Sequence, residues 1–147
     1  MSRRRDERGT ALIEVTWLTV LLLVPLVYVL LAVFTVQRSA FAVSAATRAA
    51  GRAYAVAPSE EEGRARARAA AAVALADQGL DLGRGSLTLW CEPDPARCLS
   101  PGETLHVDVR YPVPLPLVPT ALGGNTPSIR VESSHAVPYG TFREARS

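Results

Sequence analysis

The chain has 147 residues, with 16 basic and 14 acidic side chains and a formal net charge of +2. This length allows at most one domain beside a membrane element, with a core too small for a large enzyme. This net charge carries little information about partners. The lack of a basic patch with interleaved aromatic residues predicts that nucleic acid is not a partner.

An apolar stretch near the N-terminus dominates the sequence. The 22 residues 15–36 carry no charge. At about 1.5 Å of helical rise per residue they cover roughly 33 Å, enough to cross the hydrocarbon core of a bilayer. Pro25 is compatible with this because membrane helices tolerate proline better than other helices do. We therefore predict a transmembrane helix over residues 10–36.

A basic leader, residues 1–9, precedes this helix. Its charged residues are Arg3, Arg4, Arg5, Asp6, Glu7 and Arg8. Positive residues mark the cytoplasmic side, which predicts a single-pass protein of the cytoplasmic membrane with its N-terminus inside and its C-terminal domain outside. The small-x-small motif Ala40-Phe41-Ala42 offers signal peptidase cleavage as an alternative. The apolar run is, however, longer than the roughly 7–15 residues of a secretory signal.

Glu14 is the last charged residue before the apolar run. Burying a carboxylate at the start of a membrane helix costs free energy, which predicts that Glu14 has a function and a partner. The simpler alternative is an interfacial Glu whose side chain reaches back to water. Together with Gly9 it gives Gly-x-x-x-x-Glu at the start of a hydrophobic helix, which resembles the processing site of type IV pilin-like proteins. The resemblance implies cleavage between Gly9 and Thr10 by a prepilin peptidase. Glu14 can then neutralise the new α-ammonium of a neighbouring subunit.

Two helical segments follow. Residues 37–57 continue the helical pattern and are dominated by small residues, which predicts either a packing surface for other helices in an assembly or a solvated extension of the anchor. Pro58 ends this extension. Ser59 and Glu62 form a capping box, and Gly79 is a natural stop, so a second, Ala-rich helix is predicted between them.

After Gly85 the apolar period changes to two, which indicates strands. The candidates are 86–91, 104–111 and 128–134, and the residues that share one face of the second are Leu105, Val107, Val109 and Tyr111. The proline-rich segment 112–119 is predicted to be extended but not part of a central strand, and Gly123-Gly124-Asn125 to form a turn. The prediction is an α+β fold with a small antiparallel sheet of three to four strands, in an extracytoplasmic domain of residues 58–147.

Cys91 and Cys98 lie in the part predicted to be exported, where a disulfide persists. They have neither the spacing nor the histidine partners of a zinc site. We therefore predict an intramolecular disulfide that closes a short loop containing two prolines.

A set of polar residues suggests a hydrolase at first sight: His106, Asp108, Ser133, Ser134 and His135. Neither a nucleophile elbow nor a Gly-rich loop accompanies them, so they are expected to be surface polar residues. We predict no enzyme activity, no metal site and no cofactor.

Taken together, these features resemble TadE-like proteins, minor pseudopilins of the tight-adherence (Flp-type) pilus machinery. The resemblance rests on the N-terminal site and helix, the Ala-rich extension, the strand ending in Arg110-Tyr111-Pro112, Gly123-Gly124, and the tail 138–144. Val15 departs from it, because many members have an aromatic residue there. The resemblance implies a structural protein that acts with other pilin or pseudopilin subunits and an inner-membrane pilus platform. The alternative is an unprocessed, signal-anchored extracytoplasmic binding protein of the cell envelope.

Overall fold

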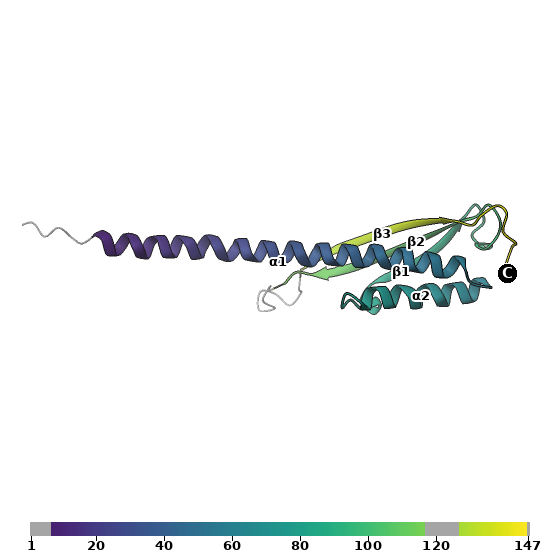
Figure 1. Cartoon of the computed structure of the whole chain (residues 1–147), viewed down its shortest axis with the longest axis horizontal. Coiled ribbons are helices and arrows are strands. Elements are labelled where there is room, and N and C mark those ends of the chain that lie inside the picture. The colour runs from purple at the N-terminus through teal and green to yellow at the C-terminus, as the bar shows by residue number, and fades with distance from the viewer. Residues whose placement is uncertain (1–6, 117–126, 147) are drawn as a thin grey trace, which may run out of the picture.

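The structure is a computed structural model that describes residues 7–116 and 127–146, with side chains from residue 13 onwards. Its elements are α1 (Glu7–Ala55), α2 (Glu60–Ala76), the 3-10 turn η1 (Leu82–Arg84), β1 (Ser86–Glu92), β2 (Thr104–Pro114) and β3 (Ser128–Pro138). Figure 1 shows α1 as a long helix whose second half lies alongside α2 and the sheet. The predicted α+β fold is confirmed, with three strands. The predicted turn Gly123-Gly124-Asn125 lies outside the described residues.

The transmembrane helix and the helical extension predicted from the sequence form a single helix. α1 runs for 49 residues and continues through Pro25. The described part of α1 starts at Glu7, ahead of the predicted start at Thr10, and passes through Gly9, since one glycine costs a helix only about 1 kcal/mol. It ends at Ala55, just before Pro58, as expected.

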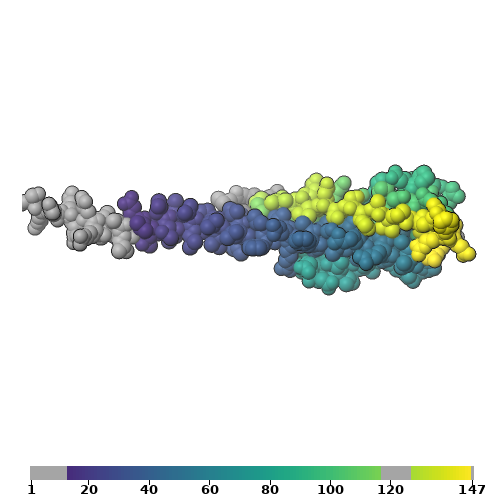
Figure 2. Space-filling view, turned by 45° about the horizontal axis from the view of Figure 1, so that its top comes forward, coloured from purple at the N-terminus to yellow at the C-terminus, as the bar shows by residue number. Residues whose placement is uncertain are grey.

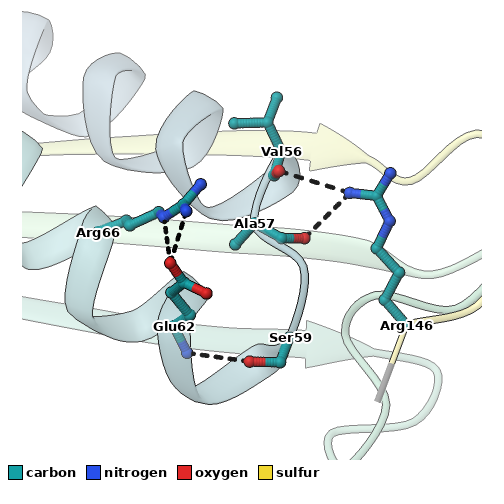
Figure 3. A network of polar contacts seen from close by, with 6 residues as sticks. All are labelled: Val56, Ala57, Ser59, Glu62, Arg66 and Arg146. Carbon is teal, nitrogen blue, oxygen red and sulfur yellow. Dashed lines mark hydrogen bonds and ion pairs between the residues drawn. The ribbon is translucent and has the colours of Figure 1, made fainter.

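The predicted start and stop of the second helix are both confirmed. The hydroxyl of Ser59 accepts a hydrogen bond from the backbone N–H of Glu62 at 3.4 Å, and the Glu62 carboxylate pairs with Arg66 at 2.5 Å (Figure 3). At the other end Gly79 adopts a φ of +71°, which favours glycine. The N–H of Leu80 then bonds back to the carbonyl of Leu75 at 3.0 Å, which closes the helix end.

The core lies between α1, α2 and the inner face of the sheet. Small side chains let these layers approach closely. The buried alanines of the core are Ala42, Ala46 and Ala50 of α1 and Ala67 and Ala71 of α2. Gly51 is also required, because a Cβ there would lie 2.7 Å from Cγ2 of Val137 on β3. Much of the small-residue extension therefore packs within its own domain.

The sheet has the order β1-β2-β3, and both pairs of strands are antiparallel. The side chains predicted to share one face of β2 are all buried, namely Leu105, Val107, Val109 and Tyr111. They are the centre of the core, since β2 is the middle strand and its inner face is covered by α1.

One expectation for the proline-rich segment was wrong. Pro112 and Pro114 belong to the central strand β2 and stand opposite Arg130 and Ser128 of β3. The reason is that β1 begins at Ser86, opposite Arg110. Beyond that point β2 has a strand neighbour on one side only, so a proline nitrogen needs no partner on the other side. Residues 117–119 of the segment lie outside the described residues.

Candidate functional site

The first half of α1 is an exposed apolar rod. The large aliphatic side chains and Trp17 between Ile13 and Leu31 are all exposed, Tyr28 among them is half-buried, and Phe34 beyond them is 64% exposed. Figure 2 shows this part standing free of the domain. α1 is long and apolar enough to cross a membrane, and exposed apolar area of this extent marks a contact with lipid or with another protein.

Two threonine hydroxyls along this rod form hydrogen bonds within the helix. Thr19 donates to the carbonyl of Val15 at 2.7 Å, and Thr35 donates to that of Leu31 at 2.8 Å. Such bonds remove the cost of placing a hydroxyl in an apolar medium. The threonines are thus compatible with an apolar environment on all sides of the helix.

Glu14 differs from these residues. Its side chain is exposed at the head of the rod, and no described residue forms an ion pair with it. The predicted processing residues Gly9 and Thr10 lie in the first turns of α1, in helical backbone. If a peptidase cleaves the bond between them, as the sequence predicts, the start of α1 has to unwind first.

The packed domain begins where the apolar run ends. Ser39, Ala42 and Val43 are buried, only a few residues after the exposed Phe34. The alternative cleavage motif Ala40-Phe41-Ala42 therefore lies inside an unbroken helix, with Ala42 in the core. Cleavage there would cut the helix on which the domain is built.

The predicted disulfide between Cys91 and Cys98 is present, with the Cα atoms 5.4 Å apart. It closes the loop that follows β1. Inside this loop Asp94 accepts from the N–H of Ala96 at 3.0 Å and pairs with Arg97 at 2.8 Å. These two contacts lower the pKa of the Asp94 carboxyl. The buried carboxylate of Glu103 accepts from the N–H of Asp94 at 3.0 Å and ties the loop to the start of β2.

Replacing both Cys91 and Cys98 by Ser is expected to lower the free energy of unfolding by roughly 2.5 kcal/mol, because the bridge closes a short loop in the unfolded chain. Chemical unfolding of the two proteins in the same detergent measures the difference. Thiol alkylation of the native protein without reduction should modify neither cysteine. Stoichiometric labelling of both would contradict the bridge and the exported topology that it supports.

The outer face of the sheet carries polar side chains around Trp90. The Trp90 and His106 rings stack with their centroids 4.0 Å apart, and His106 Nε2 lies 2.9 Å from the Glu92 carboxylate. The Trp90 indole N–H donates to Asp108 at 3.0 Å. Trp90 is 42% exposed, so this face is accessible.

The hydrolase-like residues do not assemble into a catalytic site. Ser133 and His135 lie on the inner face towards α1, whereas His106, Asp108 and Ser134 lie on the outer face. Both histidines were expected to be surface residues; each is half-buried, and His135 faces α1 rather than the outer face. The Ser134 hydroxyl bonds to Asp108 rather than to a histidine base, which is not the arrangement of an activated nucleophile. In the described part of the chain no group of three His, Cys, Asp or Glu side chains is placed to hold a metal ion.

The pKa of Asp108 is lowered by the hydrogen bond from Ser134 and then by that from Trp90. A carboxyl whose pKa is lower in the folded state than in the unfolded state, where it is about 3.9, stabilises the fold above that pH. The contribution is lost as the pH falls through the folded value. We expect wild type to lose more stability between about pH 5 and pH 2 than Asp108→Asn does. Unfolding curves at both pH values test this, with the exposed Asp77→Asn as control; equal losses in all three proteins would contradict it.

Sequence reasoning missed three arginines that bind the C-terminal ends of the helices. Arg143 donates to the carbonyl of Ala55 at 3.1 Å, and Arg146 donates to that of Ala57 at 3.0 Å (Figure 3). Arg38 of α1 donates to the carbonyl of Gln78, just after α2. Cations are favourable at the negative end of a helix dipole. No local pattern in the sequence marks these arginines, because each contact joins residues at least 40 positions apart.

No protein-family model matches the chain, and neither a curated protein nor a solved structure matches it.

Proposed function

We propose that the chain is a TadE-like minor pseudopilin that takes part in assembling a tight-adherence (Flp-type) pilus or a related secretion apparatus. The observation that carries the proposal is the Gly9–Glu14 spacing at the head of α1. The first half of this helix is exposed and apolar, and its second half is the spine of an α+β domain. The protein is then single-pass in the cytoplasmic membrane, N-terminus inside, with a structural and not a catalytic role.

The chemistry of assembly follows from the charge at Glu14. Cleavage after Gly9 by a prepilin peptidase would leave an α-ammonium on Thr10. An unpaired charge in a low-dielectric bundle is expensive, so an ammonium on one subunit and Glu14 on another select one stacking register. That Glu14 has no ionic partner among the described residues of its own chain supports an intermolecular pairing. The partners are other pilin or pseudopilin subunits and the inner-membrane platform.

Deletion of the gene in its native host is expected to abolish surface pili, and a wild-type copy should restore them. A Gly9→Leu copy should not restore them, because the bulky side chain blocks the peptidase site. Gly140→Ala is the matched control, since a Cβ there meets only ordinary contacts at 3.7 Å and more. Electron microscopy of surface filaments gives the readout, and normal piliation of the deletion strain would contradict the proposal.

A second candidate is an unprocessed, signal-anchored binding protein of the cell envelope. The accessible outer face with Trp90, His106 and Glu92 favours it, because an exposed aromatic beside charged groups suits a ligand. The two candidates differ in the mature N-terminus, which is Thr10 for a pseudopilin and lies in the leader for an anchored binding protein.

A further inference from the structure

A groove opens where the end of α2 meets α1, at the end of the domain nearest the apolar rod. Its volume is about 340 Å³, and its walls include Leu31, Phe34, Thr35 and Arg38 of α1 and Gln78 and Leu80 after α2. The volume lies at the lower end of the range of ligand pockets, roughly 300–1,000 Å³. The α1 wall is apolar where it continues the rod, at Leu31 and Phe34, and carries the guanidinium of Arg38 farther along the helix.

The position of this groove along α1 defines its depth in a bilayer. If the hydrocarbon core begins near Glu14, its other boundary lies about 30 Å farther along the helix, near Phe34. The headgroup layer adds roughly 5–8 Å, which covers about the next four or five residues. Leu31 and Phe34 then face the acyl chains, while Arg38 and Gln78 lie among the headgroups.

Arg38 has donors for an anion besides the bond that it makes within the domain. Its Nη2 donates to the carbonyl of Gln78, and a guanidinium carries five N–H groups in all. Gly79 leaves room for it, since a Cβ there would lie 3.3 Å from this nitrogen. Asp77 and Arg48 line a neighbouring groove that Arg38 also borders, but no described carboxylate forms an ion pair with Arg38. A guanidinium is well suited to a phosphate, to which it can donate two parallel hydrogen bonds.

We propose that this groove binds one glycerophospholipid of the outer leaflet. Its phosphate would contact Arg38, and the first methylenes of an acyl chain would lie against Leu31 and Phe34. The inference rests on the proposed membrane anchoring of α1. Because the groove is formed by α1 together with the end of α2, a bound lipid holds the whole domain at a defined height and orientation on the membrane.

Photo-crosslinking of the full-length protein tests this proposal. The protein is placed in nanodiscs of phosphatidylethanolamine and phosphatidylglycerol, a fraction of the latter with a diazirine close to its headgroup, and crosslinked peptides are mapped by mass spectrometry. Any membrane helix crosslinks to lipid, so the informative peptide is the one that contains Gln78–Leu80. Wild type should be labelled there. Arg38→Gln should reduce this labelling about tenfold, as expected for the loss of a charge-assisted hydrogen bond.

A second variant separates lipid binding from helix capping. Gln78→Glu keeps the backbone carbonyl that Arg38 binds but places a negative charge beside the phosphate, and it should also reduce the labelling. Arg48→Gln, an exposed arginine about 15 Å farther along α1, should not. Labelling of α1 without labelling of Gln78–Leu80, or labelling unchanged in both test variants, would overturn the lipid site and leave membrane anchoring intact. If α1 of the wild-type protein is not labelled at all, both the membrane anchoring and the lipid site are refuted.

Discussion

A Glu14→Ala protein is expected to be inserted and processed normally, yet to fail to support piliation. Insertion should not suffer, because removing a carboxylate makes entry into a membrane easier. Assembly should suffer, because the substitution leaves an α-ammonium without its partner in a low-dielectric bundle. Breaking such a pair costs about 3–5 kcal/mol, a factor of roughly 150 to 4,000 in association. The experiment compares peptidase cleavage, membrane level and surface filaments in a strain that carries only the variant.

Two matched variants make this comparison specific. Glu14→Gln retains the shape of the side chain without its charge and should fail in the same way. Glu61→Ala removes an exposed carboxylate from α2, outside the rod, and should assemble normally. Normal piliation of Glu14→Ala would mean that Glu14 is only an interfacial residue with access to water, and the pseudopilin proposal would lose its main chemical support.

Truncation of Tyr54 is expected to destabilise the domain by about 3–5 kcal/mol, the range seen for large aromatic residues replaced by Ala. Tyr54 is 1% exposed and fills the space between α1 and α2, where its ring lies 3.2 Å from the position of a Cβ on Gly63. Chemical unfolding of full-length Tyr54→Ala in detergent micelles measures the effect. A loss under about 1 kcal/mol would show that α1 and α2 repack around the cavity.

Tyr54→Phe should behave differently from the alanine variant. The buried Tyr54 hydroxyl has no partner with hydrogen-bond geometry among the described residues. Burial raises its pKa, and the approach of the Arg64 side chain partly opposes this. An unsatisfied buried polar group costs about 1–3 kcal/mol, so its removal should leave stability unchanged or increase it. A large loss in Tyr54→Phe would mean that Arg64 does bind the hydroxyl.

Local signals in the sequence were sufficient to predict most of the fold. Ser59 with Glu62 placed the start of α2, Gly79 placed its end, and the period-two pattern of β2 identified the buried face. These predictions held because each depends on residues within one turn or one strand. The first half of the proline-rich segment was judged by composition alone. Pro112 is acceptable in a central strand because β1 begins only at Ser86, opposite Arg110, which is a long-range feature.

Contacts over long sequence distances were not predictable in the same way. Arg38, Arg143 and Arg146 bind carbonyl groups that the fold brings to them, and no local pattern marks an arginine for this use. His135 was expected at the surface, but the register of β3 against β2 places it opposite Val107, on the face that packs on α1. For Glu14 the sequence indicated a function because a carboxylate at the start of a membrane helix is energetically costly. Its proposed partner is on another molecule, so the structure of a single chain does not contain the contact.

The mass of the mature protein tests the central claim most directly. Full-length protein is extracted from membranes of the native host and of a strain without the prepilin peptidase, and its N-terminus is determined by intact mass and terminal sequencing. We predict a chain that begins at Thr10 in the first strain and a chain that retains the leader, residues 1–9, in the second. An intact leader in cells that make pili, or a chain that begins at Thr10 without the peptidase, would contradict the account.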